Sequence, residues 1–452
     1  MASTYLSRTP ASSGTLTTWT YSCWVKRLKT DEDAYLIWAN DSGTTENDTI
    51  IINSNNVIYY NIKNSNVTVG RLVTNQVFRD TSAWYHIVFV WDTTNATSGD
   101  RMRIYVNGER VTSFSTETQP SQNATSSSLN ANKLHLINQT NYGGSYQNVQ
   151  TDILMAHVHF IDGTAYDADT FGETDATTGI WKPKTAPSVT YGTNGFFLKF
   201  ENSAAFGTDS SGNANNFTVN GTMTQTIDTP SNVFATFNAL DNYYQADTLS
   251  NGNLTMVGGG VYAPRTATFG LTSGKWYWEI QVNNWESSDG SSIGISSQLA
   301  TASNYEFVNQ SGANVGYGYF SNGSGYGNAG TIFTGYGTGS GTHIIGVALD
   351  LDSNKIAWSY DGVWQGSADP SNGTNMISIT DTTSLNSGVY FPAFSQKDNS
   401  RVFNVNFGNG YFGTTAVSSA ENPDDGIGIF EYAVPTGYKA LCTKSINAQE
   451  YD

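Results

Sequence analysis

The stretch GTHIIGVALDLDSNKIAWSYDG, residues 341–362, decides the fold class of this chain. Two apolar runs face each other across Asp352-Ser353-Asn354-Lys355, and Gly, Asp and Trp interrupt them at spacings that no amphipathic helix uses. Short runs of β-branched and aromatic residues between turn formers are typical of β-strands. The stretch therefore predicts a β-hairpin, and Asp350 and Asp352 are interpreted as residues of its turn.

The same rhythm extends over most of the 452 residues. Only 13% of the residues are charged, whereas Gly (45), Tyr (26), Phe (22) and Trp (11) are abundant. Asn107-Gly108 between two apolar runs is a strong hairpin signal, and residues 166–173 are the one short helix that the sequence predicts. The composition predicts an all-β protein of two antiparallel β-sandwich (jelly-roll) domains in tandem, with a short β linker and a C-terminal arm.

Proline-rich and polar stretches set the expected boundaries. The segment WKPKTAPSVTYG (181–192) interrupts the apolar rhythm, and DTPSN (228–232) does so again. We expect a first sandwich over 1–190, a β linker over 191–235, a second sandwich over 236–412 and an arm over 413–452. The arm has conspicuous apolar residues, Ile427, Ile429, Phe430 and Tyr432, but too few for a core of its own, so it is expected to lie on a domain or on a partner protein.

Charge and cysteine content exclude several classes of function. The net charge of −17 disfavours binding to nucleic acid or to anionic membranes. Two cysteines, Cys23 and Cys442, make neither a disulfide framework nor a zinc pattern. No apolar run is long enough to span a membrane, and the N-terminus has no signal-peptide pattern, so synthesis in a cytosol is expected.

The first 190 residues resemble the laminin G-like, concanavalin A-like jelly roll. The residues that carry this resemblance are TWTYSCWVK (18–26), WYHIVFVWD with MRIYVNGERV (84–111), and ILMAHVHFIDGTAYDADTF (153–171). In that family the middle block is a pair of long strands joined at the Asn-Gly turn, and the last block is the closing strand.

The second half resembles a SPRY domain, a bent antiparallel sandwich. Its blocks occur in order: KWYWEIQV (275–282), IGIS (293–296), residues 341–366, YFPAFS (390–395) and VNFG (405–408). The resemblance implies that Trp358 and Tyr360 lie on the strand that returns from the 352–355 turn. It also implies ligand contacts through loops at one edge of the sandwich.

The joining segments resemble parts of structural proteins of marine tailed bacteriophages, often fibre or appendage proteins. They are DSSGNANNFTVNG (209–221), DTPSN (228–232) and PTGYKALCT (435–443). This resemblance implies that the protein is assembled into a virion in a bacterial cytosol, without a signal peptide.

The sequence lacks the patterns of the common hydrolytic sites. No Gly-x-Ser-x-Gly elbow is present, and His86 lies inside an apolar strand, where packing or a hydrogen bond explains it. His157 and His159 share a strand face but have no evident third metal ligand. Glu279 stands alone, whereas glycoside hydrolysis needs a pair of carboxylates. We therefore predict no catalytic residue and no enzyme.

Calcium is the one ion that the sequence suggests. The resemblance to laminin G-like domains implies a site at the sandwich rim, and two loops offer the hard oxygen ligands that calcium prefers. The candidate ligands are Asp41, Glu46 and Asp48 in the first loop and Asp209 and Asn213 in the second. Neither loop has the EF-hand spacing, and loops rich in Asp and Asn are usually only turns.

Aromatic residues in the edge loops of the second sandwich are the candidate ligand contacts, because aromatic rings combine a large apolar area with a polar handle. The candidate residues are Trp285, Asp289, Tyr305, Tyr326, Tyr336 and Trp364. Packing within the loops or the core is the alternative for each.

The function that we expect is that of a non-enzymatic virion protein, a tail fibre or surface appendage that binds a host-surface glycan or protein receptor. Other virion proteins and copies of the same chain, in a homo-oligomer such as a trimer, are the expected partners, since many weak contacts on one particle raise avidity. The alternatives are a capsid-decorating or cement protein without a host ligand, and an enzyme that degrades polysaccharide.

Overall fold

The computed structural model describes residues 4–40, 45–147, 151–241, 247–260, 263–286, 290–299, 307–308, 314–328, 330–396 and 400–451. The chain divides into two compact units, unit 1 (Met1–Ser231) and unit 2 (Asn232–Asp452). Within the described ranges the only α-helix is α1 (Thr443–Tyr451), and every strand pairing but one is antiparallel. The predicted all-β fold is thereby confirmed. No described helix has the length and hydropathy needed to cross a membrane.

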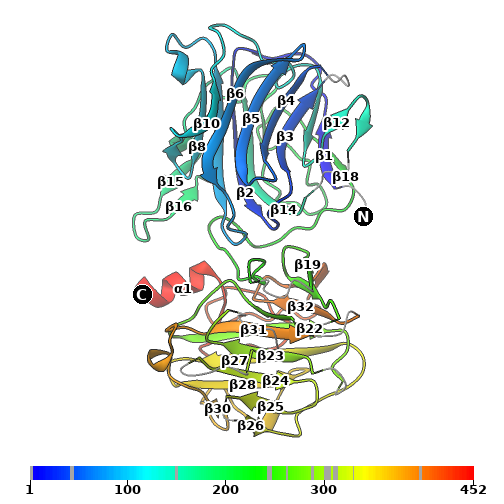
Figure 1. Cartoon of the computed structure of the whole chain (residues 1–452), viewed down its shortest axis with the longest axis vertical. Helices are drawn as coiled ribbons and strands as arrows, with labels where there is room; N and C mark the ends of the chain where they lie inside the picture. Colours follow the sequence, from blue (N-terminus) through cyan, green and yellow to red (C-terminus); the bar gives the residue numbers. More distant parts are fainter. Residues whose placement is uncertain are drawn as a thin grey trace. The chain divides into compact units, whose positions relative to one another are not determined.

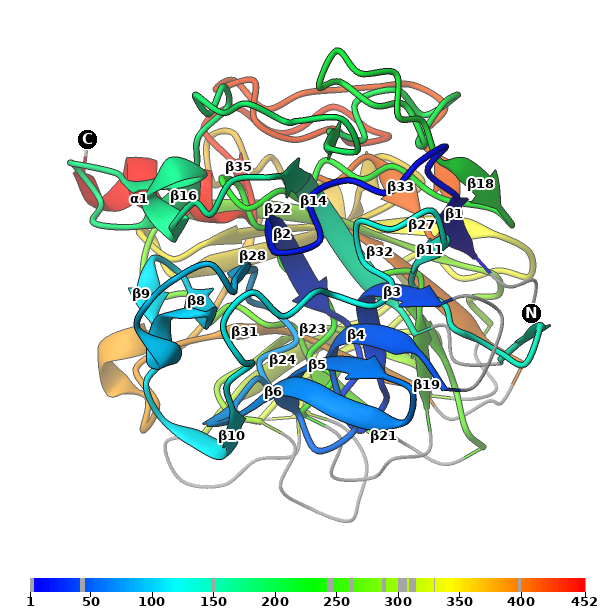
Figure 2. The ribbon, with the colours of Figure 1, turned by 90° about the horizontal axis from the view of Figure 1, so that it is seen from above.

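Unit 1 is a sandwich of two antiparallel sheets (Figures 1 and 2). The eight-stranded sheet runs in the order β10 (Phe114–Thr118), β6 (Val67–Val77), β5 (Val57–Asn64), β4 (Asn47–Ile52), β3 (Ala34–Asn40), β11 (Leu134–Ile137), β1 (Tyr5–Arg8) and β18 (Thr218–Asn220). The six-stranded sheet runs in the order β17 (Phe196–Leu198), β14 (Ile153–Asp162), β2 (Thr18–Arg27), β7 (Tyr85–Asp92), β8 (Met102–Val106) and β9 (Glu109–Arg110). Two hairpins and two 3₁₀ turns complete the unit: β12 (Asn141–Tyr142) with β13 (Ser145–Tyr146), β15 (Gly172–Thr174) with β16 (Trp181–Pro183), η1 (Ser98–Asp100) and η2 (Ala168–Thr170).

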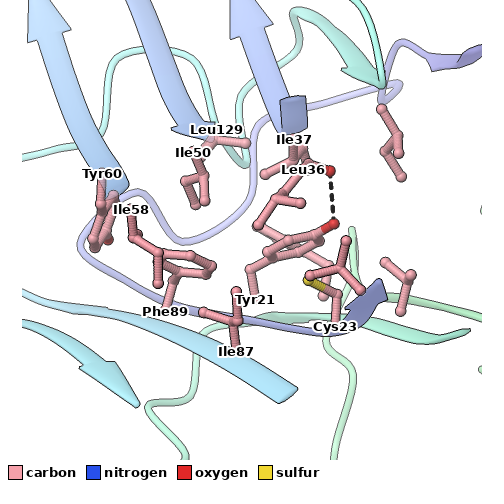
Figure 3. Packing of buried hydrophobic residues seen from close by; sticks show 14 of the residues in the cluster. Tyr21, Cys23, Leu36, Ile37, Ile50, Ile58, Tyr60, Ile87, Phe89 and Leu129 are labelled. Carbon is pink, nitrogen blue, oxygen red and sulfur yellow. Dashed lines mark hydrogen bonds between the residues drawn. The ribbon is translucent and has the colours of Figure 1, made fainter. Parts of the chain in front are cut away.

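Alternating side chains of both sheets fill the core of unit 1. Tyr21 and Cys23 point inward from β2, Phe89 from β7 and Tyr60 from β5, and all are fully buried. The Tyr21 hydroxyl donates to the Leu36 carbonyl at 2.8 Å, so its polar end is satisfied inside the sandwich (Figure 3). Successive residues of a strand point to opposite faces, and on the outer face of the six-stranded sheet Val88, Val90 and Phe171 belong to a second buried cluster.

The segment expected as a linker, 191–235, is largely built into unit 1. Its strand β17 pairs with β14 and its strand β18 pairs with β1, so it extends one edge of each sheet. Phe196 and Leu198 are buried in the core, and Asp209 accepts a hydrogen bond from the Phe197 N–H at 2.8 Å. The apolar residues that it contributes to the core are the physical reason why this segment does not behave as a free connection.

Unit 2 also contains two layers of strands. The nine-stranded sheet has β19 (Thr248–Ser250), β20 (Thr255–Val257), β32 (Val402–Asn406), β22 (Lys275–Val282), β27 (His343–Asp350), β28 (Lys355–Tyr360) and β29 (Val363–Trp364) in order, with β30 (Ile377–Ser378) on β28 and β35 (Lys439–Ala440) on β22. The six-stranded sheet has β21 (Ala263–Thr266), β31 (Phe391–Gln396), β23 (Ser292–Ser296), β24 (Gly316–Phe320), β25 (Gly325–Gly327) and β26 (Gly330–Phe333). The hairpin of β33 (Tyr411–Phe412) and β34 (Thr415–Ala416) and the 3₁₀ turns η3 (Gln365–Ser367) and η4 (Thr382–Ser384) stand outside these sheets.

The stretch that opened the sequence argument forms the expected hairpin. Strands β27 and β28 pair from Ile345–Tyr360 to Asp350–Lys355, and the turn between them includes Asn354 at a φ of 54°. Lys355 is already the first residue of β28, so the turn lies one residue earlier than expected. Trp358 lies on the returning strand, is buried, and donates from its indole N–H to the Ile293 carbonyl of the other sheet at 3.1 Å.

The expected C-terminal arm packs on unit 2 itself. Strand β35 lies parallel to β22, and Phe430 is fully buried against Tyr277, with 4.9 Å between the ring centroids. The carboxylate of Glu279 accepts the main-chain N–H groups of Glu431 and Tyr432, both at 2.9 Å. Phe430 is therefore unavailable for a partner protein, because β22 and its neighbours already bury it.

Candidate functional site

The outer face of the eight-stranded sheet in unit 1 presents a continuous row of side chains. Residues that are paired across an antiparallel sheet share one face, and the register joins one residue from each of the eight strands. In sheet order from β18 the row is Thr218, Ser7, Leu136, Trp38, Thr49, Asn61, Arg71 and Thr118. A second row beside it contains Tyr35, Ile51, Tyr59 and Val73.

Six aromatic residues gather on this face, and we call them the aromatic face: Tyr5, Tyr35, Trp38, Tyr59, Tyr142 and Tyr146. The hairpin β12–β13 supplies Tyr142 and Tyr146 at the β1 side of the sheet (Figure 1). Gly143 and Gly144 form its turn at φ values of 60° and 80°, which glycine adopts without strain.

The two hairpin tyrosines rest on aromatic residues of the sheet. Tyr142 meets Trp38 edge-on with 5.7 Å between the centroids, and Tyr146 meets Tyr5 at 5.3 Å. Trp38 is fully buried, whereas Tyr142 is 38% and Tyr146 50% exposed. The buried ring thus holds its neighbour in place, and the exposed rings offer flat apolar surface together with a hydroxyl group.

Polar groups flank Tyr59, another ring of the aromatic face. Asn61, on the strand that carries Tyr59, accepts from Arg71 Nε at 2.9 Å, and the Arg71 guanidinium lies 5.3 Å from the centroid of the Tyr59 ring. Partial burial raises the pKa of Tyr59, and the nearby Arg71 cation opposes the shift. Burial also raises the pKa of Tyr142 and of Tyr5, so these phenols remain neutral hydrogen-bonding groups at physiological pH.

The candidate contacts in unit 2 do not form one cluster. Trp285 is fully buried in the core beside Tyr319, which excludes it as a surface contact. Tyr326 packs edge-on against Phe320 at 4.9 Å. Asp289 and Tyr305 lie outside the described residues.

The other two described candidates, Tyr336 and Trp364, pack against different clusters of unit 2. Tyr336 stacks on Phe333 at 3.7 Å, and a Cβ added to Gly366 would come within 2.5 Å of the Tyr336 hydroxyl. Trp364, two residues before this glycine, is half-buried on β29. Phe333 occupies one face of the Tyr336 ring, so the pair offers less free aromatic surface than the aromatic face of unit 1.

The candidate calcium ligands are already bound by protein groups. Asp48 is buried, and its carboxylate accepts from Ser127 Oγ and from the N–H groups of Ser128 and Leu129 at 2.7 to 2.8 Å. Burial raises its pKa to about 6, and these hydrogen bonds oppose the shift. Glu46 pairs with Lys133.

The candidate calcium ligands of the second loop also form hydrogen bonds with protein groups. Both Asp209 oxygens accept hydrogen bonds within the loop, and the Asn213 amide donates to the carbonyls of Gly192 and Gly195. No group of three His, Cys, Asp or Glu residues suited to a metal occurs in the described parts of the chain, and Asp41 lies outside them. The described candidates thus engage protein groups in this structure, and calcium binding stays a prediction.

One serine and histidine pair has the separation of a nucleophile and its base. Ser22 Oγ lies 2.9 Å from His86 Nε2 on the outer face of the six-stranded sheet. The Trp181 indole N–H, which can only donate, contacts His86 Nδ1 at 3.0 Å. Burial lowers the pKa of His86 to about 3, so the ring is neutral and its single proton lies on Nε2. That nitrogen donates to Ser22 and cannot accept the serine proton, so the pair is structural.

The sequence reasoning missed the aromatic face, although two signals for it are present. In VIYYNIKN (57–64), Ile58, Tyr60 and Ile62 point to the core, and the intervening Tyr59, Asn61 and Lys63 therefore form a polar and aromatic outer face. In NYGGSY (141–146), two tyrosines flank a Gly-Gly turn. The two segments lie about 80 residues apart in the sequence. Neither segment by itself indicates that the fold brings them to the same face of the sheet.

Comparisons with known proteins agree with the architecture of unit 1. Residues 2–150 match the concanavalin A-like lectin/glucanases superfamily, and this region includes all six residues of the aromatic face. The match covers the N-terminal region and not the chain as a whole. The comparison with curated proteins found no match.

Solved structures similar to parts of this chain include two SPRY domains and a pentraxin. The SPRY domain of human HERC1 is 16% identical and covers 37% of this chain and 96% of its own, with a TM-score of 0.28. The TRIM65 PSpry domain is 13% identical and covers 38% and 91%, with a TM-score of 0.28. The heptameric SAP-like pentraxin from Limulus polyphemus is 13% identical and covers 49% and 90%, with a TM-score of 0.30. At scores this low these similarities say nothing about ligand or partner.

Proposed function

We propose that this chain is a non-enzymatic glycan-binding protein and that the aromatic face of unit 1 contacts the sugar. The observation that carries the proposal is the pair of exposed hairpin tyrosines, Tyr142 and Tyr146, held against Trp38 and Tyr5 of the sheet. Aromatic rings cover the apolar faces of sugar rings, and neighbouring polar groups bind the hydroxyls. The match of residues 2–150 to a superfamily of lectins and glucanases supports the same ligand class.

The proposed setting is the virion of a tailed bacteriophage, where the protein serves as a tail fibre or surface appendage that attaches to a host-surface glycan. The support is the resemblance of residues 209–221, 228–232 and 435–443 to segments of phage structural proteins. Copies arrayed on one particle, in a homo-oligomer and with other virion proteins, would turn weak single contacts into firm attachment.

Binding of the full chain to an array of bacterial surface glycans tests the proposal. The double variant Y142A/Y146A should weaken binding by about 1–2 kcal/mol per ring, roughly 5–30-fold for each, because each ring supplies stacking area. W364A in unit 2 is the matched control and should bind like the wild type. Loss of binding in W364A but not in Y142A/Y146A would place the site in unit 2, and the absence of any bound glycan would refute the function.

A further inference from the structure

Arg71 stands out on the outer face of the eight-stranded sheet because two neutral side chains fix its guanidinium. Nε donates to Asn61 Oδ1 at 2.9 Å and Nη2 donates to Thr68 Oγ1 at 3.0 Å. An arginine has five N–H donors, and the remaining three, including both on Nη1, have no partner in the described ranges. The end of the guanidinium that can bind a carboxylate through two parallel hydrogen bonds is therefore free.

The charge of Arg71 is also unpaired. Three other arginines are paired with carboxylates, in Arg103–Asp167, Arg110–Asp100 and Arg265–Asp247. No ion pair of Arg71 or of Lys63 occurs among the described residues, although the chain has 38 acidic and only 21 basic Lys and Arg residues. Lys63 lies on the same face of β5 as Asn61, the cross-strand neighbour of Arg71. Arg71 thus lies over the Tyr59 ring without an acidic partner, and Lys63 is a second such cation farther along the same face of β5.

We infer that the ligand of the aromatic face is an acidic polysaccharide whose carboxylate binds Arg71, with Lys63 as a second cation. The inference rests on the proposed function and adds the chemical class of the sugar. Arg71 on β6 and Trp38 on β3 are three strand spacings apart, about 14 Å. A chain of several sugar units can therefore contact Tyr142 with one residue and Arg71 with another. The acidic group near the aromatic residues is Asp33, which accepts from the Ser54 N–H and acts electrostatically on Tyr35 and Tyr142, so the carboxylate of the sugar chain is expected at the β6 end of the face.

Because the protein has a strongly negative net charge, its binding of an acidic polysaccharide would be evidence for a local cationic site. At −17 the molecule repels a polyanion at long range. Binding of an acidic polysaccharide cannot then arise from bulk charge attraction and requires a local cationic site.

The test compares three immobilised polymers with the full-length protein: a polyuronate, the same polymer after reduction of its carboxyl groups, and a neutral galactan carrying sulfate esters. The wild type should bind the polyuronate at least about tenfold more tightly than the reduced polymer, and R71Q should lose about tenfold in affinity, the effect of one charge-assisted hydrogen bond. K63Q should lose less. R110Q removes the same charge from β9 in the other sheet and should bind as the wild type does.

Each other outcome has a separate meaning. Equal binding of the polyuronate and its reduced form would overturn the inference and leave the proposed function standing. Binding of the sulfated galactan but not of the polyuronate would refute the proposed carboxylate and would show that the acidic group of the ligand is a sulfate ester. Equal losses in R71Q and R110Q would overturn the role of Arg71, and binding of no glycan at all would refute both this inference and the proposed function. Thermal unfolding at the wild-type midpoint shows that each variant is folded.

Discussion

Glu279 shows how a single buried carboxylate fastens the C-terminal segment to unit 2. Its two oxygens accept from Tyr277 Oη, from the Glu431 and Tyr432 N–H groups, and at 3.5 Å from Asn406. Burial raises its pKa from the ordinary 4.5 to about 7, although these hydrogen bonds favour the ionised form. Glu279 therefore holds the C-terminal segment in place. Because its ionised form is disfavoured by burial, its contribution to the free energy of unfolding depends on pH.

The sign of this dependence follows from proton linkage. Below about pH 4.5 Glu279 is protonated in both the folded and the unfolded chain, and it contributes no pH dependence. Between about 4.5 and 7 the unfolded chain releases the proton first, so the free energy of unfolding falls as the pH rises, by at most about 3 kcal/mol in total. Denaturant unfolding of the wild type and of E279Q across pH 4 to 8 should show a difference that changes over this window and is flat above it. A constant difference would contradict the account.

The hairpin β15–β16 is an element held by one tryptophan. The indole ring of Trp181 lies against Gly172 and Gly108, where a Cβ would come within 2.4 Å and 3.0 Å of its atoms, and its N–H reaches His86. G172A should therefore displace the ring and loosen the hairpin, which limited proteolysis between residues 174 and 180 measures. G99A is the control, because a Cβ there meets nothing within 4 Å. Unchanged cleavage in G172A would show that the hairpin does not depend on this contact.

At the scale of elements, the sequence predicted strands well and their partners poorly. The 352–355 turn and the Asn107-Gly108 hairpin follow from local turn chemistry, and the structure contains both. The helix α1 was missed because the segment TKSINAQEY has no apolar stripe. Tyr59 and Tyr142 come together only through the order of strands in the sheet, which distant pairing determines, so each short stretch indicates its own outward residues but not that they share one face.

Asp228 fastens the C-terminal end of unit 1 to the six-stranded sheet of the same unit. Its carboxylate accepts from Lys26 Nζ at 2.8 Å and from the Trp84 indole N–H at 2.7 Å, and the Lys26 side chain is fully buried. Removing one partner of a buried ion pair leaves an uncompensated charge and costs about 3–5 kcal/mol.

At the scale of the whole molecule, removal of the Lys26–Asp228 ion pair tests whether the two units unfold independently. D228A should lower the transition of unit 1 in a calorimetric scan and leave that of unit 2 in place. D425A, an exposed carboxylate in unit 2, is the control and should move neither transition. A parallel shift of both transitions in D228A would show that the units unfold as one.

The claim on which the function depends is that the outer face of the eight-stranded sheet in unit 1 holds a sugar. A crystal structure of the full chain with a bound host-surface oligosaccharide measures this most directly. We predict a sugar ring stacked on Tyr142 or Tyr146, with the chain extending across the sheet toward Arg71. An oligosaccharide bound at the loops of unit 2, with the aromatic face empty, would contradict the account.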